Sequence, residues 1–317
     1  MNKLISLVAA SSAAALLCVA SVSPSYAQFT AFVSHSGTDT GTCTAAQPCR
    51  TIGYAYTAAA AGGGVVSCLD AGPYTENRAF GLPVTVDCRG VVYAGGNSAF
   101  SLAFQLGTSN VTFRHVIFDG ASGGGSAVQI AGGRAVFEDC TFQNFTASPG
   151  DAIQFAPTVA GAQLTVTDSV FANNGVAGSG GSILIQPSAG VTAGVVIERT
   201  QITGNTYGII AAGDAGGTAL VDVRYSTIAN SVFDGIWAVT QGTTASVVVE
   251  HSATIRNGGS GANAQGSNAY VSLSDSTVAW NATGLTTSSG GTILSYKNNL
   301  IGGNPIPGVT PISVSQQ

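Results

Sequence analysis

Short runs of alternating apolar and polar residues recur along most of the chain, separated by tight polar turns. The stretch 195–213 contains three such runs, VVIE, QIT and GIIAAG, with two turns between them. A period of two residues predicts β-strands whose successive side chains lie on opposite faces. The inward-facing residues are expected to be Val195, Ile197, Ile202, Ile209 and Ala211, and the outward-facing ones Val196, Glu198, Arg199 and Ile210. Three strands this short cannot bury a core by themselves.

The same three-strand pattern occurs eight times. The copies begin at Val111, Ala135, Leu164, Val195, Val221, Val247, Val271 and Ile293, at intervals of 22 to 31 residues. A period in the twenties without a recurring helix indicates a solenoid, in which each coil buries its inward face against the next coil about 4.8 Å away. We therefore predict an all-β fold, a single-stranded parallel β-helix of roughly ten coils.

An asparagine recurs near the second turn of these copies. The positions are Asn144, Asn173 or Asn174, Asn205, Asn230, Asn257 and Asn281. Asparagine side chains stacked along the axis can hydrogen-bond to one another and to the backbone of the turn. We interpret this row as a structural ladder, although Asn144 and Asn281 also fit the N-x-S/T pattern for glycosylation.

These repeats and their asparagine row resemble the right-handed parallel β-helix repeats of the pectin lyase-like superfamily. The stretch FVSHSGTDTGTCTAAQPCRTIGYAYTAAAAGGGVVSCLDAGPYTE is similar to the cap and first coil of many secreted members. The resemblance covers nearly all of residues 29–304. It implies an amphipathic helix over about residues 51–61 that covers the open end of the solenoid, with Ile52, Tyr56 and Ala59 facing the core and Gly62 ending the helix.

The chain divides into four expected segments. Residues 1–27 have an apolar run from Leu4 to Ala20 and end in Ser25-Tyr26-Ala27, which is typical of a signal peptide cut after Ala27. A cap is expected over residues 28–64, the β-helix over 65–304 and a proline-interrupted tail over 305–317. We therefore predict a secreted or periplasmic protein, without a membrane anchor because no later apolar run is long enough to span a bilayer.

The charge balance narrows the range of partners. Charged residues make up only 8% of the chain, with 15 Asp and Glu against 10 Lys and Arg. A sparse, acidic surface argues against nucleic acid and against anionic membranes as partners. The same charge disfavours binding of pectate or alginate unless a cation bridges the two. The sequence leaves the oligomeric state open.

The cysteines fit an exported protein. Cys43 and Cys49 flank a short turn, and Cys68 and Cys88 end two strand-like runs, so we predict two disulfides, Cys43–Cys49 and Cys68–Cys88. Cys140 is left over. We interpret it as a buried free thiol that packs as a small apolar residue and not as a nucleophile.

A charged patch is the first candidate site. The known motifs of polygalacturonases, alginate epimerases and pectate lyases do not occur in the chain. Members of the superfamily usually place their active site on the first sheet, which in this register brings outward-facing charged residues of three consecutive coils together. The candidate catalytic residues are Asp222, Arg224, Glu250 and His251. The candidate calcium ligands are Glu198, Asp222 and Glu250, because carboxylate oxygens are the ligands that Ca²⁺ prefers.

This patch has three interpretations. With Ca²⁺ bound, Arg224 or His251 would abstract a proton beside a uronate, as in a polysaccharide lyase. Asp222 and Glu250 could instead form the carboxylate pair of a glycoside hydrolase. The third interpretation is a surface ladder of alternating charges without chemistry, and we favour it because Glu198, Arg224 and Glu250 share one position on successive coils.

A second outward row lies on the third strand of each coil. Its members include Gln154, Leu184, Ile210, Trp237 and Asn263. Trp237 could stack against sugar rings, with Gln154 and Asn263 as hydrogen-bonding partners in substrate binding. We therefore expect a secreted protein that binds extracellular or cell-wall polysaccharide along an elongated face. The alternatives are a divergent polysaccharide lyase or glycoside hydrolase and a cell-surface, adhesin-like structural module.

Overall fold

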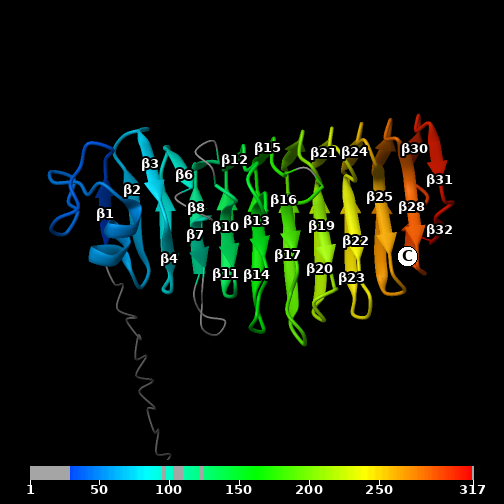
Figure 1. Ribbon diagram of the computed structural model, residues 1–317, viewed down its shortest axis with the longest axis horizontal. Helices are drawn as coiled ribbons and strands as arrows, with labels where there is room; N and C mark the ends of the chain where they lie inside the picture. Colours follow the sequence, from blue (N-terminus) through cyan, green and yellow to red (C-terminus); the bar gives the residue numbers. More distant parts are fainter. Residues whose placement is uncertain (1–28, 95–97, 103–109, 121–123, 177, 316–317) are drawn as a thin grey trace, which may run out of the picture.

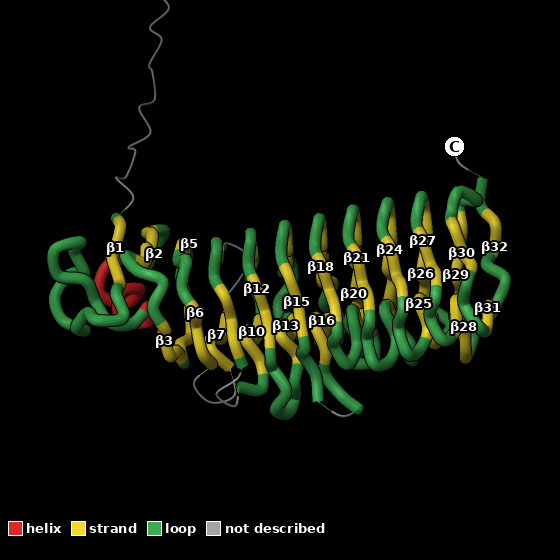
Figure 2. The backbone as a smooth tube through the Cα atoms, turned by 90° about the horizontal axis from the view of Figure 1, so that it is seen from above, coloured by secondary structure: helices red, strands yellow, loops and turns green. Residues whose placement is uncertain are grey.

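The computed structural model describes residues 29–94, 98–102, 110–120, 124–176 and 178–315, so the expected signal peptide lies outside the described residues. The chain winds into an elongated solenoid whose strands stack into three parallel sheets along its length (Figures 1 and 2). Each coil contributes one strand to each sheet in turn. The all-β parallel solenoid predicted from the repeats is confirmed.

The first sheet has 12 strands. They are β1 (Thr30–Val33), β2 (Gly64–Cys68), β5 (Val84–Asp87), β8 (Asn110–Arg114), β11 (Arg134–Glu138), β14 (Gln163–Thr167), β17 (Thr192–Glu198), β20 (Thr218–Arg224), β23 (Ala245–Glu250), β26 (Ala269–Ser274), β29 (Thr292–Ser295) and β32 (Ile312–Ser313).

The second sheet has 10 strands. They are β3 (Pro73–Glu76), β6 (Val91–Ala94), β9 (Ile117–Asp119), β12 (Thr141–Gln143), β15 (Val170–Ala172), β18 (Gln201–Thr203), β21 (Thr227–Ala229), β24 (Ala253–Ile255), β27 (Thr277–Ala279) and β30 (Leu300–Gly302).

The third sheet also has 10 strands. They are β4 (Arg78–Phe80), β7 (Ser98–Leu102), β10 (Ser126–Ile130), β13 (Asp151–Phe155), β16 (Gly181–Ile185), β19 (Ile209–Ala212), β22 (Ile236–Val239), β25 (Ser260–Gln265), β28 (Thr283–Ser288) and β31 (Ile306–Gly308).

Where we expected roughly ten coils, the regular part has eight turns, from β8 to β31, one for each sequence repeat. Strands β2 to β7 belong to the same three sheets, although their sequence does not show the repeat. In the proline-interrupted tail, β31 completes the eighth turn by pairing with β28, and β32 extends the first sheet by pairing with β29.

The core is a column of apolar side chains inside the coil stack. The expected inward residues of the 195–213 coil are all buried. In the earlier coils the column is aromatic: Phe142 stacks on Phe118 and Phe171 with ring centroids 4.7 and 4.5 Å apart. Like residues therefore stack on like residues, because each coil repeats the inward positions of its neighbour.

The asparagine ladder runs along the second turn, between the second and third sheets. Asn174, Asn205, Asn257, Asn281 and Asn304 occupy it. Each accepts a hydrogen bond at Oδ1 from the backbone N–H of the preceding coil, as between Asn257 N and Asn281 Oδ1 at 2.9 Å. The predicted members Asn144 and Asn230 lie outside this buried row, and Asn144 accepts instead from Asn173 Nδ2 of the next coil at 2.8 Å. They lie one residue earlier, at the positive-φ position of the turn, where asparagine is tolerated better than most residues.

Ser231 interrupts this ladder. It is buried at the ladder position between Asn205 and Asn257, and its Oγ has no hydrogen-bond partner among the described residues. We expect Ser231→Asn to accept from the Asn205 N–H, as its neighbours do, and to raise the free energy of unfolding by about 1 kcal/mol. Urea unfolding followed by circular dichroism measures this. An unchanged or lower midpoint would contradict the ladder geometry at this coil.

A hydroxyl row lines the first turn, between the first and second sheets. The backbone N–H of Thr200, Ser226 and Ser252 each donates to the hydroxyl of the next coil, at 3.1, 3.0 and 3.2 Å. Cys140 occupies the same position in an earlier coil, and its N–H donates to Ser169. Cys140 is buried, as expected, and burial raises the pKa of its thiol to about 12, so it is inert.

The N-terminal end is covered by a short helical segment, α1 (Ile52–Ala55) followed by the π-helix η1 (Tyr56–Ala60), seen at that end in Figure 2. Thr51 caps α1 by accepting from the Tyr54 N–H. Ile52 and Tyr56 are buried against the first coils, as expected. The side chain of Ala59 lies outside what the structure describes.

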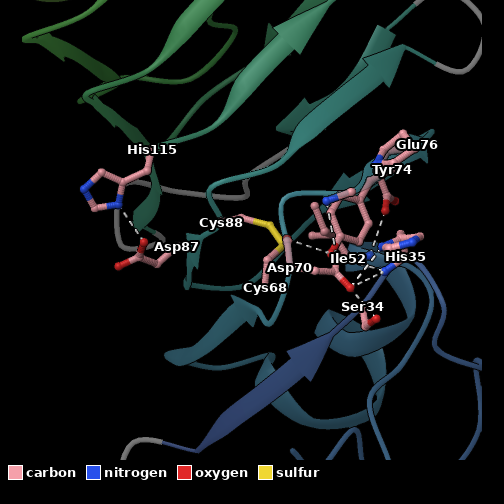
Figure 3. The surroundings of a disulfide bond; sticks show 12 residues. Ser34, His35, Ile52, Cys68, Asp70, Tyr74, Glu76, Asp87, Cys88 and His115 are labelled. Carbon is pink, nitrogen blue, oxygen red and sulfur yellow. Dashed lines mark hydrogen bonds and ion pairs between the residues drawn. A yellow bond between two sulfur atoms is a disulfide. The ribbon is translucent and has the colours of Figure 1, made fainter.

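Two disulfides are present. Cys43–Cys49 closes a loop within the cap, and Cys68–Cys88 links the end of strand β2 to the segment after β5 in the first coils. Beside the second one, Asp70 accepts hydrogen bonds from the hydroxyls of Ser34 and Tyr74 and pairs with His35 (Figure 3). Burial acts to raise the pKa of Asp70, but these hydrogen bonds outweigh it and lower the pKa. The cluster fixes β1 to the first coil.

Glu76 holds the cap helix from the second sheet. Its buried carboxylate accepts from the N–H groups of Ile52 and Gly53 at 2.7 and 3.2 Å. Burial raises the pKa of Glu76 to about 7 against the opposing effect of these two N–H groups. Asp39 and Arg50 are the nearby charges.

A carboxyl group whose pKa rises on folding adds stability below its ordinary pKa and loses this contribution as the pH rises through the folded value. We therefore expect the stability to fall between about pH 4.5 and pH 7, by at most about 3 kcal/mol from Glu76. Glu76→Gln should flatten this part of the pH–stability curve. A curve unchanged by the substitution would mean that Glu76 titrates normally; Asp151, whose pKa burial also raises to about 7, supplies any remaining slope.

Candidate functional site

The charged patch lies on the outer face of the first sheet. Register pairs Glu198 with Arg224 and Arg224 with Glu250, so these three side chains form one row across β17, β20 and β23. Asp222 lies two residues earlier on β20, paired with Val196 and Val248. The alternation of charge along the row is the arrangement expected of a surface ion ladder.

Three of the four candidate catalytic residues take part in ion pairs. Arg224 pairs with Asp222 on its own strand. This hydrogen bond raises the pKa of the Arg224 guanidinium above its ordinary value, which disfavours Arg224 as a base. His251 turns away toward Asp275, 3.7 Å from its carboxylate, and stacks on the ring of Tyr225. Of the four candidate catalytic residues, only Asp222 and Arg224 are joined by an ion pair.

The three candidate calcium ligands are Glu198, Asp222 and Glu250. Within the described residues, no group of three or more Asp, Glu, His or Cys side chains converges closely enough to hold a metal ion. Glu198 pairs instead with Arg199, which also makes a two-pronged ion pair with Asp168 at 2.7 and 2.9 Å.

A hollow of about 410 Å³ lies beside this patch on the first sheet. Its lining is mainly apolar, from Leu220, Val196 and Val248, and Asp222 is its one charged member. Gly194 lies in the outward row between Gln163 and Leu220. It has no side chain, and a Cβ added there would meet no atom within 4 Å, so this position leaves the hollow open.

The second outward row lies on the third sheet. Register places Gln154, Leu184, Ile210, Trp237 and Asn263 side by side on β13, β16, β19, β22 and β25. Trp237 and Asn263 are therefore neighbours. Gln154 lies three strands away from Trp237, about 14 Å at the usual strand spacing. The structure brings two of the three predicted binding residues together.

An aromatic cluster covers the middle of this row. The ring of Tyr207 stacks on those of Phe233 and Trp237, with centroids 5.0 and 5.5 Å away and interplanar angles of 24° and 25°. Beneath them, Ile210, Ala212 and Val239 form a small apolar cluster outside the main core. Phe233 remains 39% exposed, and Tyr207 and Trp237 are partly exposed, so the cluster presents aromatic side chains to solvent.

Polar groups flank the aromatic cluster. Asp234 accepts from the Ser260 N–H at 2.6 Å and from Asn263 Nδ2 at 2.9 Å. This second bond fixes the Asn263 amide, leaving its Oδ1 shielded from solvent and without a partner among the described residues. The indole N–H of Trp237, on the adjacent strand, is likewise shielded and unpaired.

A second hollow, of about 320 Å³, lies where β22 and β25 end. Its lining includes Gln241, Gln265, Ser267 and Ser289, and Val239 connects it to the aromatic cluster. The other lining residues are Thr240 and Gly266, so this hollow contains amides and hydroxyls but no charged side chain. The outer face of the third sheet therefore joins an aromatic surface to a neutral polar hollow.

The sequence reasoning missed Tyr207, Phe233 and Asp234. All three lie in the second turn, within two residues of the glycine that precedes the third strand, in the segments NTYG and NSVFDG. A signal was present, because an aromatic residue occurs near this glycine in two consecutive coils. Turn residues do not follow the alternation that assigns the faces of strand residues, so the strand pattern does not predict where these side chains lie.

Comparisons with known proteins give one partial family match and several distant structural neighbours. The family model described as a right-handed β-helix region matches residues 89–222. Similar solved structures include pectate lyase Pel9A, 14% identical over 90% of this chain and 79% of its own, with a TM-score of 0.46. Another is the A-module of mannuronan C-5 epimerase AlgE4 from Azotobacter vinelandii, 14% identical over 80% of this chain and 91% of its own, with a TM-score of 0.40. No curated protein matches the chain.

The strand pairing forms a parallel β-solenoid of three sheets, and residues 89–222 of this solenoid match the family model of a right-handed β-helix region. No helix among the described residues is long and apolar enough to cross a bilayer. The two disulfides are consistent with a secreted protein, because such bonds persist in oxidising compartments.

Proposed function

We propose that this protein is exported and binds polysaccharide along the outer face of the third sheet. The observation that carries the proposal is the cluster of Phe233, Tyr207 and Trp237, which presents partly exposed aromatic side chains on an elongated scaffold. Sugar rings have apolar C–H faces that pack on aromatic rings, and their hydroxyls need polar partners close by. Asn263 and the hollow around Gln265 supply such partners.

Trp237→Ala should weaken polysaccharide binding at least about tenfold, because central aromatic side chains carry most of the energy of such a surface. Affinity electrophoresis of residues 28–317 through gels that contain single polysaccharides measures this loss. Tyr225→Asn is the matched control: Tyr225 is an exposed aromatic residue of the first turn, outside the third sheet, and asparagine tolerates its positive φ. Equal retardation of wild type and Trp237→Ala would contradict the proposed surface.

A divergent polysaccharide lyase or hydrolase is the second candidate, favoured by the hollow over Asp222. Turnover would then release unsaturated uronates, which absorb ultraviolet light, or new reducing ends. Gly194→Gln should fill the hollow without a clash, since the space around Gly194 is open. Activity that survives both Gly194→Gln and Asp222→Asn would exclude this hollow as the active site, whether or not calcium is added.

A further inference from the structure

Building on the proposed function, we propose that the glycan held at the third sheet is neutral and not a polymer of uronic acids. The face consists of the third-sheet strands β19, β22, β25 and β28 with their flanking turns, residues 206–217, 232–244, 258–268 and 282–291. These segments contain the aromatic cluster and the polar hollow, and every one of their residues is described. Their charge favours a neutral ligand, and their hydrogen-bonding groups suit the hydroxyls of a sugar.

The charge of this face is the first argument. The four segments contain no Lys, Arg or His, and their charged residues are Asp214 and Asp234. A uronate chain carries one negative charge on each sugar, and its binding requires arginine, lysine or a metal ion to neutralise it. The face offers no such cation and instead has carboxylates that repel an anionic polymer. Burial and the nearby Asp234 carboxylate raise the pKa of Tyr207, which places this negative charge beside the aromatic cluster.

Asp234 is also committed to the protein. Its two carboxylate oxygens accept from the Ser260 N–H and from the Asn263 amide. Among the described residues, Asp234 belongs to no group of three or more Asp, Glu, His or Cys side chains that could hold a calcium ion bridging the face to a uronate. Asp234 therefore acts as a positioning residue for Asn263 and not as a ligand for a bridging metal.

The unpaired polar atoms are the second argument. The Trp237 indole N–H is a donor and the Asn263 Oδ1 is an acceptor, on neighbouring strands. Polar atoms left shielded and unpaired are rare in folded proteins, so each calls for a partner that the free protein lacks. A sugar hydroxyl donates and accepts hydrogen bonds at once and so matches both atoms without any need for a charged group. Because both atoms are shielded in the free protein, binding must shift the indole ring.

The hollow beside the cluster is the third argument. Gln241, Gln265, Ser267 and Ser289 line it with groups that both donate and accept hydrogen bonds. Such a lining can donate hydrogen bonds to sugar hydroxyls and accept hydrogen bonds from them. It carries no positive charge that would favour an anion. A glycan chain lying across the strands would place one ring on the aromatic stack and the next sugars over the hollow.

The test is a panel of neutral polymers (galactomannan, xyloglucan, β-1,3-glucan and starch) against polygalacturonate and alginate, each with calcium and with chelator. We expect Trp237-dependent binding to at least one neutral polymer, unchanged by chelator or by 0.5 M salt to within about twofold. Trp237-dependent binding to acidic polymers alone, or binding that chelator abolishes, would overturn this inference and leave the proposed function standing. Failure to bind any polymer would overturn both.

Two variants sharpen the result. Gln265→Lys installs in the hollow the cation that the face lacks. It should increase the affinity for polygalacturonate severalfold at low salt, without strengthening binding of a neutral polymer.

Trp237→Phe keeps an aromatic ring but loses the indole N–H, and it should weaken binding of a neutral polymer less than Trp237→Ala does. Trp280 is the other tryptophan, so in a Trp280→Phe background the intrinsic fluorescence reports Trp237 alone and should change on binding. A spectrum that stays constant at saturation would contradict the expected shift of the indole ring.

Discussion

Asn281→Ala should lower the free energy of unfolding by about 3–5 kcal/mol, among the largest losses for any single substitution in the solenoid. The Asn281 side chain is fully buried and makes four hydrogen bonds: its Oδ1 accepts from the N–H and from Nδ2 of Asn257, and its Nδ2 donates to Thr254 O and Asn304 Oδ1. Alanine leaves several of these groups buried without partners, and each costs about 1–3 kcal/mol. Urea unfolding with the disulfides intact measures the loss.

Asn230→Gly provides the matched control for the ladder. Asn230 occupies the exposed, positive-φ position of the same turn and donates only to the Thr203 hydroxyl, so glycine there should change stability by less than about 1 kcal/mol. If Asn230→Gly were as damaging as Asn281→Ala, the exposed row would carry the stability and the ladder assignment would be wrong.

Phe142→Ala should cost about 3–5 kcal/mol, because it removes a fully buried ring from the middle of the aromatic column. Phe142 stacks on Phe118 and Phe171 and meets Phe137 edge to face at 5.3 Å. The rings above and below are held by their own coils, so they cannot close the cavity. Differential scanning calorimetry of the two proteins gives the difference.

Phe233→Ala removes the same atoms from the surface cluster. Phe233 is partly exposed and packs on one side only, so we expect a stability loss of no more than about 1 kcal/mol. The two substitutions should separate structure from function: Phe142→Ala lowers stability, and Phe233→Ala lowers glycan affinity. A large loss of stability in Phe233→Ala would assign the surface cluster to the core.

The fold was predictable because one pattern is repeated eight times. Each copy supplies an independent sample of the strand alternation, so the inward positions such as Ile197 and Ile202 could be assigned before the structure was known. The sequence predicted that an asparagine ladder exists, but not which asparagine of each turn belongs to its buried row. Asn173 and Asn174 are adjacent, as are Asn230 and Ser231, and only the backbone φ distinguishes the exposed position from the buried one.

The candidate sites were harder to predict because they depend on what neighbouring coils do together. Asp222 and Arg224 were placed correctly on one face, but the sequence could not reveal that Arg224 pairs with Asp222 or that His251 turns toward Asp275. The hollow over Asp222 results from an absent side chain at Gly194. The aromatic stack around Trp237 depends on turn residues, whose directions do not follow strand alternation.

A crystal structure with an oligosaccharide cut from a polymer that the protein binds would show where the glycan lies. We expect sugar rings packed on the cluster of Phe233, Tyr207 and Trp237, with hydroxyls reaching Asn263 and the hollow around Gln265. An oligosaccharide bound instead in the hollow over Asp222 on the first sheet, with the aromatic cluster unoccupied, would refute binding at the third sheet.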